Sequence, residues 1–295
     1  MGYSARYHAA SLAAVFLALA VGILIGAGLG DTVLSNTEEN LRESLEGDIE
    51  DAQRRASDLE TELDRERQFG ERAYPALVGN RLKGERVEVI ALGDLPGGLS
   101  EEIEAALRPA GAELAQISVV RSPPDVAGLA SEIDRKRYAK IEDDPDRLEE
   151  LANRLGEQLA RGRGKSLAAT RDVLLSRSSG GGAPIDRVVL FRTAPSDGGS
   201  EDRASRDRFE AGIVTGVDDS GVPTVAVERS GEDASSVPFF ASHDISTVDD
   251  VDLVSGRVAM IFALLGANGN FGIKGTADSL LPELLVPARD SGTGG

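Results

Sequence analysis

The first strong pattern along the chain is a continuous apolar stretch close to its N-terminus. Residues 9–30 contain no charged side chain, and Ser11 is the one polar residue among them. About 20 apolar residues at about 1.5 Å each cover the roughly 30 Å hydrocarbon core of a bilayer, and a helix of a soluble domain rarely stays apolar on every side for so long. The pattern therefore predicts a transmembrane helix over residues 9–30.

The charges beside this helix predict its orientation. Arg6 precedes the helix and an acidic segment begins at Asp31 after it, and basic residues are retained on the cytoplasmic side. We expect residues 1–8 to be a cytoplasmic tail and the rest to be extracytoplasmic, in a protein that crosses the cell membrane once. The alternative is a signal peptide cleaved near Gly28 or Gly30, but the apolar run exceeds the usual length of about 7–15 residues. An uncleaved signal-anchor is the better interpretation.

Residues 31–72 change to charged, helix-forming residues with a seam of apolar positions. The seam spacing of 4, 3, 4, 3 and 4 residues is typical of a coiled coil. Its positions are Leu45, Ile49, Ala52, Ala56, Leu59 and Leu63. Within the membrane helix, Gly22 and Gly26 form a GxxxG pair, which lets two helices approach closely. Both features predict self-association, and the stalk can be either a simple spacer or a binding surface for a partner.

After the stalk, residues 84–178 begin with alternating strand and helix patterns. Residues 86–92 and 113–120 are predicted strands, and Ser100 is expected to cap a helix over residues 101–107 between them. A helical crossover requires the two strands to be parallel, as in a βαβ unit. The glycine-rich turn after the first strand lacks the order of a nucleotide-binding loop, so no cofactor is predicted.

A polar helical insert is expected from Asp125 to about Ser178, with one helix beginning near Pro145. This helix places four leucines at helical spacing, namely Leu148, Leu151, Leu155 and Leu159. The basic cluster at residues 161–165 is interpreted as a solvated helix junction rather than an anion site. Residues 178–184 are rich in serine and glycine, and they predict a flexible loop or hinge.

Residues 184–286 repeat the alternation, with strands at 186–191 and 223–227 and a helix at 201–214. A flexible tail is expected to follow at residues 287–295. The sequence therefore predicts an α/β protein: a transmembrane helix, a long coiled-coil helix, and a mostly parallel, doubly wound (Rossmann-like) sheet in two βαβ halves. Such folds bind ligands at the carboxyl ends of their strands. The loop after the strand at 186–191 is expected at that edge, with Ser196, Asp197, Gly198 and Gly199.

Composition narrows the functional classes. The formal net charge is −18 at pH 7, and an acidic surface repels phosphate backbones, so no nucleic-acid partner is expected. The chain has no cysteine. Disulfides and thiolate metal sites are therefore excluded.

Three segments carry a resemblance to a known family: residues 7–20, the stretch Ile245–Asp252 with Gly256 and Arg257, and Phe271–Gly275. Together with the stalk they resemble the actinobacterial copper transport protein B (MctB) family over essentially the full length. The resemblance implies an envelope protein of copper transport or homeostasis, and some relatives are linked instead to envelope assembly and cell separation. The motif residues, as candidate ligand or partner contacts, are Ser246, Thr247, Asp249, Asp250, Asp252, Gly256, Arg257, Gly272 and Gly275.

The residues themselves do not form a copper site. Copper(I) prefers thiolate and thioether ligands, and copper(II) prefers imidazole. The chain offers only His8, His243, Met1 and Met260 as such ligands, and Met260 lies in an apolar segment where packing is its expected role. Any part in copper flux is therefore expected to require partners or an indirect route.

The acidic triplet of the motif allows two interpretations. In an extended segment, Asp250 and Asp252 share a face and could hold calcium or magnesium through oxygen. Acidic residues more often cap the next helix or accept hydrogen bonds from backbone amides in a turn. We favour the structural role, with no metal ligand assigned. Ser246 and Asp249 with the nearby His243 do not form a nucleophilic triad, and no enzyme is predicted.

Two functions therefore remain. The first is a single-pass envelope protein of copper homeostasis without its own copper site. The second is an extracytoplasmic scaffold that presents the α/β domain to proteins of envelope assembly or wall remodelling. Membrane lipid around residues 9–30 and a second copy of the chain are further expected partners.

Overall fold

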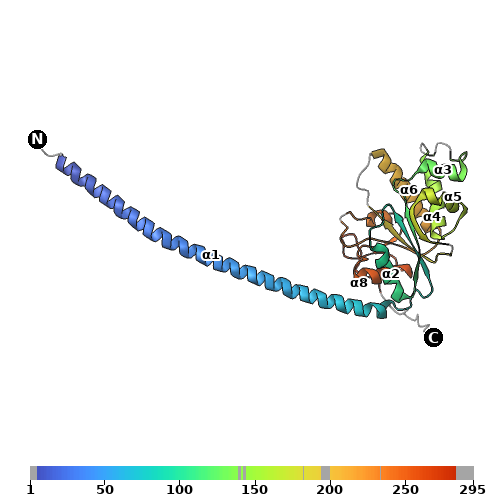
Figure 1. The fold of residues 1–295 in the computed structure, drawn as a ribbon, viewed down its shortest axis with the longest axis horizontal. Coiled ribbons are helices and arrows are strands. Elements are labelled where there is room, and N and C mark those ends of the chain that lie inside the picture. Colours follow the sequence, from blue (N-terminus) through green and yellow to red (C-terminus); the bar gives the residue numbers. More distant parts are fainter. Residues whose placement is uncertain are drawn as a thin grey trace, which may run out of the picture. The chain divides into compact units, whose positions relative to one another are not determined.

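The computed structural model describes residues 5–138, 141, 144–181, 183–193, 200–232 and 234–283, and it divides into two compact units at Glu66 and Arg67. The first unit is formed by the N-terminal part of helix α1 (Ala5–Val78), drawn in blue in Figure 1. Within α1, the segment His8–Ala27 has a mean hydropathy of 2.5, and none of it is buried by protein. This length and composition fit a membrane anchor.

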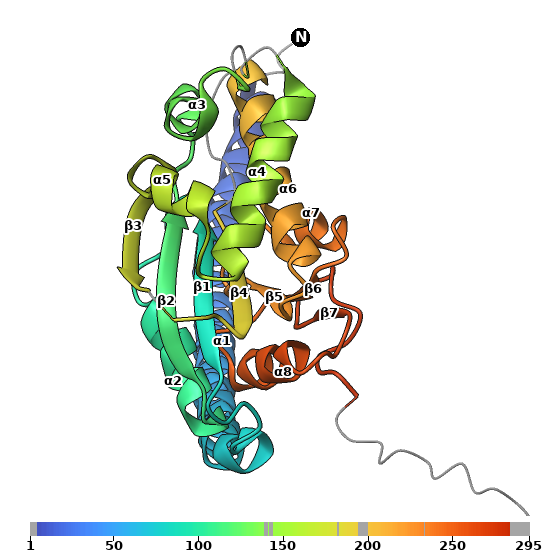
Figure 2. The same cartoon turned by 90° about the vertical axis from the view of Figure 1, so that its right-hand side faces the viewer.

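The second unit is built on one sheet, which has seven strands in the described residues. In chain order these are β1 (Arg86–Leu92), β2 (Glu113–Val120), β3 (Leu175–Gly180), β4 (Arg187–Arg192), β5 (Thr224–Val227), β6 (Ser246–Val248) and β7 (Asn270–Phe271). The spatial order is β3-β2-β1-β4-β5-β6-β7 (Figure 2). All neighbours are parallel except β2 and β3. The prediction of a mixed α/β fold with a mostly parallel sheet is confirmed.

Helices cover both faces of this sheet (Figure 1). One face carries α3 (Val126–Asp134), α4 (Pro145–Ala160), α5 (Lys165–Leu174), α6 (Ser200–Asp219) and α7 (Val237–Ala241), and the other carries α2 (Leu99–Ala110), α8 (Val254–Leu264) and the last turns of α1. Alternate residues of β1 enter the two cores, with Val89 on the α2 and α8 side and Ile90 on the other. Strands buried on both faces are continuously apolar, and this is why the central strands could be found in the sequence.

Helices α4 and α6 pack with almost no side chain between them. A methyl group built on Gly156 would lie 2.1 Å from the carbonyl oxygen of Ile213, and one on Gly216 would lie 1.9 Å from that of Asn153. These glycines let the two backbones touch. The helix predicted to end at residue 214 therefore continues to Asp219, because packing on α4 stabilises the turns around Gly216.

The edge strand β3 contradicts two expectations. The sequence predicted helix to about Ser178 and a flexible loop over residues 178–184, whereas residues 175–180 pair with β2 in antiparallel register. Only Leu175 of this strand is buried, and the other five residues are exposed. The strand therefore lacks the alternation of apolar and polar residues that identifies a half-buried strand, and it is stabilised mainly by its ladder to β2.

The ends of two helices also differ from expectation. Helix α2 begins at Leu99 after Gly98, whose φ is 82°, so Ser100 is not its N-cap and instead donates to the Glu101 carboxylate at 3.0 Å. Helix α1 continues through Pro75 to Val78, beyond the predicted end of the stalk. The cause is the buried Tyr74, whose hydroxyl donates to a carbonyl of α2 at 2.7 Å.

Candidate functional site

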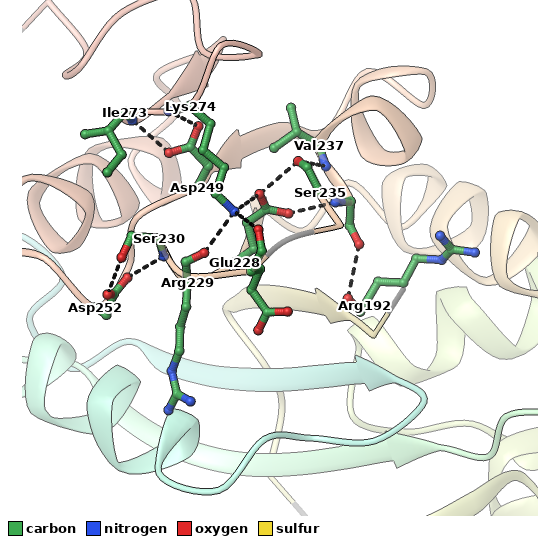
Figure 3. Close-up of polar contacts among 12 residues, drawn as sticks. Arg192, Glu228, Arg229, Ser230, Ser235, Val237, Asp249, Asp252, Ile273 and Lys274 are labelled. Carbon is green, nitrogen blue, oxygen red and sulfur yellow. Dashed lines mark hydrogen bonds and ion pairs between the residues drawn. The ribbon is translucent and has the colours of Figure 1, made fainter. Parts of the chain in front are cut away.

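The carboxyl ends of β5, β6 and β7 carry a cluster of charged side chains, drawn in Figure 3. Glu228 directly follows β5, Asp249 and Asp250 directly follow β6, and Lys274 lies just beyond β7. Three of these four side chains belong to residues that are nearly inaccessible to water, namely Glu228, Asp249 and Asp250. We call these four residues the carboxyl-end cluster.

Lys274 joins the loops that follow β5 and β7. Its Nζ donates to Glu228 Oε1 at 2.7 Å, to the Arg229 carbonyl at 3.0 Å and to the Glu232 carbonyl at 3.1 Å. These three acceptors match the three protons of an ammonium group. Glu228 in turn accepts hydrogen bonds from the Ser235 hydroxyl at 2.8 Å and from the backbone N–H of Ser236 at 2.7 Å. The pair is therefore fully engaged within the protein.

Asp249 holds the loop after β7. One carboxylate oxygen accepts the N–H of Ile273 at 2.8 Å, and the other accepts the N–H of Lys274 at 3.1 Å. Gly272 makes this approach possible, because a methyl group there would lie 1.9 Å from Asp249 Oδ1 and its φ is +136°. Asp249 thus satisfies backbone amides, one of the two structural roles expected for the triplet.

Asp250 is fully buried beside the first turn of α8. It accepts a hydrogen bond from the Ser255 hydroxyl at 2.6 Å, and its Oδ1 has no partner in the described residues. Burial raises the pKa of Asp250 above its ordinary value, although the Ser255 hydrogen bond acts against that shift. A methyl group on Gly256 would lie 2.1 Å from the Asp250 carbonyl oxygen, so a larger residue does not fit.

Asp252 has separate partners, because its carboxylate accepts both the N–H and the hydroxyl of Ser230 at 2.7 Å. The N-cap of α8 is Leu253, and no side chain caps that helix, so the expected capping role is wrong. Among the residues that the structure describes, no group of three His, Asp or Glu side chains could hold a metal ion. The interpretation of Asp250 and Asp252 as a calcium or magnesium site gains no support.

The hydroxyls of β6 are used within the sheet. Ser246 donates to the Ala267 carbonyl at 3.3 Å and accepts the Gly269 N–H at 3.3 Å, and Thr247 donates to Asn270 Oδ1 at 2.9 Å. These contacts fasten β6 to β7 and the turn before it. They provide a structural reason for both hydroxyls in the motif.

Arg257 connects α8 to the last turns of α1. Its guanidinium pairs with Glu71 and lies 5.4 Å from the centre of the Tyr74 ring. By contrast, Gly275 is exposed, and a methyl group built on it would have no atom within 4 Å. The structure therefore brings most motif residues into one framework, and Gly275 stands outside it.

Sequence reasoning missed Glu228, Lys274 and the extension of their network to β4. The Ser236 hydroxyl donates to the Arg192 carbonyl at 3.1 Å, and the Arg192 guanidinium pairs with Glu210 at 2.7 Å. It also lies 4.1 Å from the Phe239 ring centre. The position of Glu228 in the sequence could have indicated this network, because a charged residue that directly follows a buried strand must find a partner.

Strand order reverses between β1 and β4, which is where doubly wound folds hold ligands. A methyl group on Gly93 would lie 3.5 Å from the Thr193 side chain and 3.6 Å from that of Ser122. These two side chains therefore flank Gly93 at this point of the sheet. The predicted edge residues Ser196, Asp197, Gly198 and Gly199 lie outside the described residues.

The predicted association surfaces lie in α1. Gly22 and Gly26 have no atom within 4 Å of a built methyl group. Each of the four large seam side chains is at least half exposed, and Ala52 and Ala56 are exposed too.

Gly272→Ala is expected to lower the free energy of unfolding by about 2–3 kcal/mol, because the new methyl group displaces the Asp249 carboxylate and strains the backbone. Gly275→Ala, the matched control in the same loop, is expected to change it by less than about 0.5 kcal/mol. Denaturant unfolding of the full chain in detergent, followed by circular dichroism, measures both values. Equal stability of the two variants would contradict the role assigned to Asp249.

Comparison with known proteins places this framework in a family. No curated protein matches the chain. The family described as copper transport outer membrane protein, MctB, matches residues 3–282, which includes the α1 anchor segment, the stalk and the carboxyl-end cluster. Because the match covers nearly the whole chain, this protein belongs to the MctB family of copper transport outer membrane proteins.

Proposed function

We propose that this protein serves copper transport or homeostasis as a single-pass, membrane-anchored envelope protein without enzymatic activity or a copper site of its own. The observation that carries the proposal is the family match over residues 3–282, which implies a function related to copper transport. The anchor is the apolar segment His8–Ala27. The role in copper flux is exerted through partner proteins.

The state of the candidate copper ligands supports an indirect role. His243 Nδ1 lies 2.8 Å from the Phe239 carbonyl oxygen, and its ring packs against the Phe239 ring at 5.0 Å between centres. Met260 belongs to α8 and is completely buried in the core. The ectodomain sequence offers no cysteine to complete a soft site.

A deletion strain tests the copper role. Deletion is expected to change the cellular copper content and the tolerance of growth to copper, and the wild-type chain is expected to restore both. The double variant His243→Ala/Met260→Leu should restore them equally well, because neither side chain is proposed to bind copper. Failure of this variant at normal abundance would overturn the indirect route.

The alternative function is an extracytoplasmic scaffold for envelope assembly or cell separation. The internal hydrogen bonds of Glu228, Asp249 and Lys274 favour it, because these charges stabilise the domain and leave binding to its surface. A deletion strain with a defect in cell separation and unchanged copper content would support this alternative. Crosslinking of the full-length protein in membranes would then identify the envelope protein that it contacts.

We propose that the N-terminus is cytoplasmic and that the chain after the membrane segment lies on the extracytoplasmic side of the cell membrane. The absence of cysteine makes single-cysteine labelling unambiguous. In intact cells, a membrane-impermeant maleimide is expected to label Ser57→Cys but not Ser4→Cys, which should react only after permeabilisation. Labelling of Ser4→Cys alone would reverse the orientation. Separation of inner and outer membranes would distinguish the cell membrane from the outer membrane indicated by the family name.

We further propose that residues 84–178 and 184–286 are two halves of one doubly wound sheet.

We also propose that α1 self-associates as a coiled coil. Leu45, Ile49, Leu59 and Leu63 are 51–59% exposed in the single chain, and tethering in a membrane raises the effective concentration of two such helices. A paired stalk would bury this seam.

Ile49→Asp/Leu59→Asp is expected to halve the mass of the detergent-solubilised protein, because the new charges enter the seam. Ser57→Asp/Thr61→Asp adds the same charge outside the seam and should leave the mass unchanged. Light scattering coupled to size-exclusion chromatography measures both. A monomeric mass for the unchanged chain would exclude stable self-association in detergent.

A further inference from the structure

A second buried polar cluster lies between β1 and β2, far along the sheet from the carboxyl-end cluster. Glu88 of β1 is completely buried and accepts hydrogen bonds from the Ser118 hydroxyl at 2.6 Å and the Gln116 side-chain amide at 2.8 Å. Gln116 and Ser118 are also buried, at 2% and 0% exposure. Nothing in the family motifs or in the proposed function uses these residues.

The cluster is incompletely satisfied. Glu88 Oε2 and Gln116 Oε1 have no hydrogen-bond partner in the described residues. Both bonds to Glu88 come from neutral donors, and the neighbouring position on β4 is the apolar Val188. Arg171 of α5 is the charged group whose electrostatic effect lowers the pKa of this carboxyl. Burial raises the pKa of Glu88 to about 7, and this effect outweighs the two hydrogen bonds and Arg171, which act in the opposite direction.

The end of β3 lies directly beside this cluster. Gly180 is paired with Gln116 across the antiparallel ladder. A methyl group built on Gly181 would lie 3.3 Å from Gln116 Oε1 and 3.5 Å from an Arg171 nitrogen. Since five of the six β3 residues are exposed, little apolar burial opposes separation of this end from β2. Separation would admit water to the unpartnered Gln116 oxygen and to the Glu88 carboxyl that is hydrogen-bonded to the same side chain.

We propose that Glu88 is a proton-binding switch whose ionisation releases the C-terminal end of β3 from β2. The protonated carboxyl fits the closed, dry arrangement. The ionised carboxyl requires solvation, and displacement of the end of β3 admits the water that supplies it. The domain thereby responds to the acidity of its surroundings at a sheet edge that bears no family motif.

The direction of the response follows from the proton balance. The closed state holds its proton up to about pH 7, whereas an open, solvated glutamate loses it above its ordinary pKa of 4.5. Opening therefore releases a proton between these values, and the open fraction rises by about tenfold per pH unit before it levels off above pH 7. Over this whole pH range the open fraction rises by a few hundredfold in total.

Hydrogen exchange of the full chain in lipid nanodiscs tests the switch between pH 5 and 8.5. After correction for the intrinsic exchange rate, protection of the amides that join β2 to β3 is expected to fall by about tenfold per pH unit up to about pH 7 and then stay constant. Amides of β6 and α8 should keep their protection. A parallel loss across all strands would show that Glu88 controls global stability, and this would overturn the proposal.

Variants separate the switch from general effects of pH. Glu88→Gln should abolish the pH dependence, whereas Glu113→Gln, at an exposed position of the same sheet region, should leave it unchanged. Ser118→Ala is the milder variant should Glu88→Gln fail to fold: it removes a hydrogen bond that favours the ionised form, so protection should continue to fall beyond pH 7. An unaltered profile in Ser118→Ala would refute the assignment to Glu88. These readouts are independent of copper and of the membrane topology.

Discussion

The second unit depends on satisfying charges that its sheet removes from water. An isolated buried carboxylate or ammonium is expensive, and breaking a buried pair costs more than the pair contributes. Here Glu228 and Lys274 satisfy each other, and Asp249 takes the two N–H groups that a tight loop leaves open. The loops after β5, β6 and β7 are therefore held by electrostatics and hydrogen bonds at an edge that apolar packing alone does not order.

This arrangement changes the meaning of the family motif. Two aspartates are each matched by a glycine that gives them room, Asp249 by Gly272 and Asp250 by Gly256. A pattern of acids and glycines that resembles a ligand site is thus used to close a loop and to seat a helix. A functional surface of this domain is therefore to be sought on its exposed faces, where partner proteins would bind.

Part of the structure was predictable from the sequence because it depends on local patterns. The apolar runs of β1 and β4 and the glycine after α2 identify their elements directly, and the apolar helix was evident from length alone. Strand β3 was missed because its side chains carry no burial pattern, and the length of α6 was missed because Gly216 reads as a break until α4 is seen beside it. The partners of Glu228 and Glu88 are distant in sequence, so pairing them required the fold.

The contact of Arg257 with Glu71 and Tyr74 bears on how the domain withstands mechanical load. Tension on the last turns of α1 would be transmitted through this guanidinium to α8, whose first turn packs on the buried Asp250 through Gly256. The same helix end is also fastened to α2 through the Tyr74 hydroxyl. Because these attachments lie on different helices, a pulling force on this end of α1 would be shared between α8 and α2.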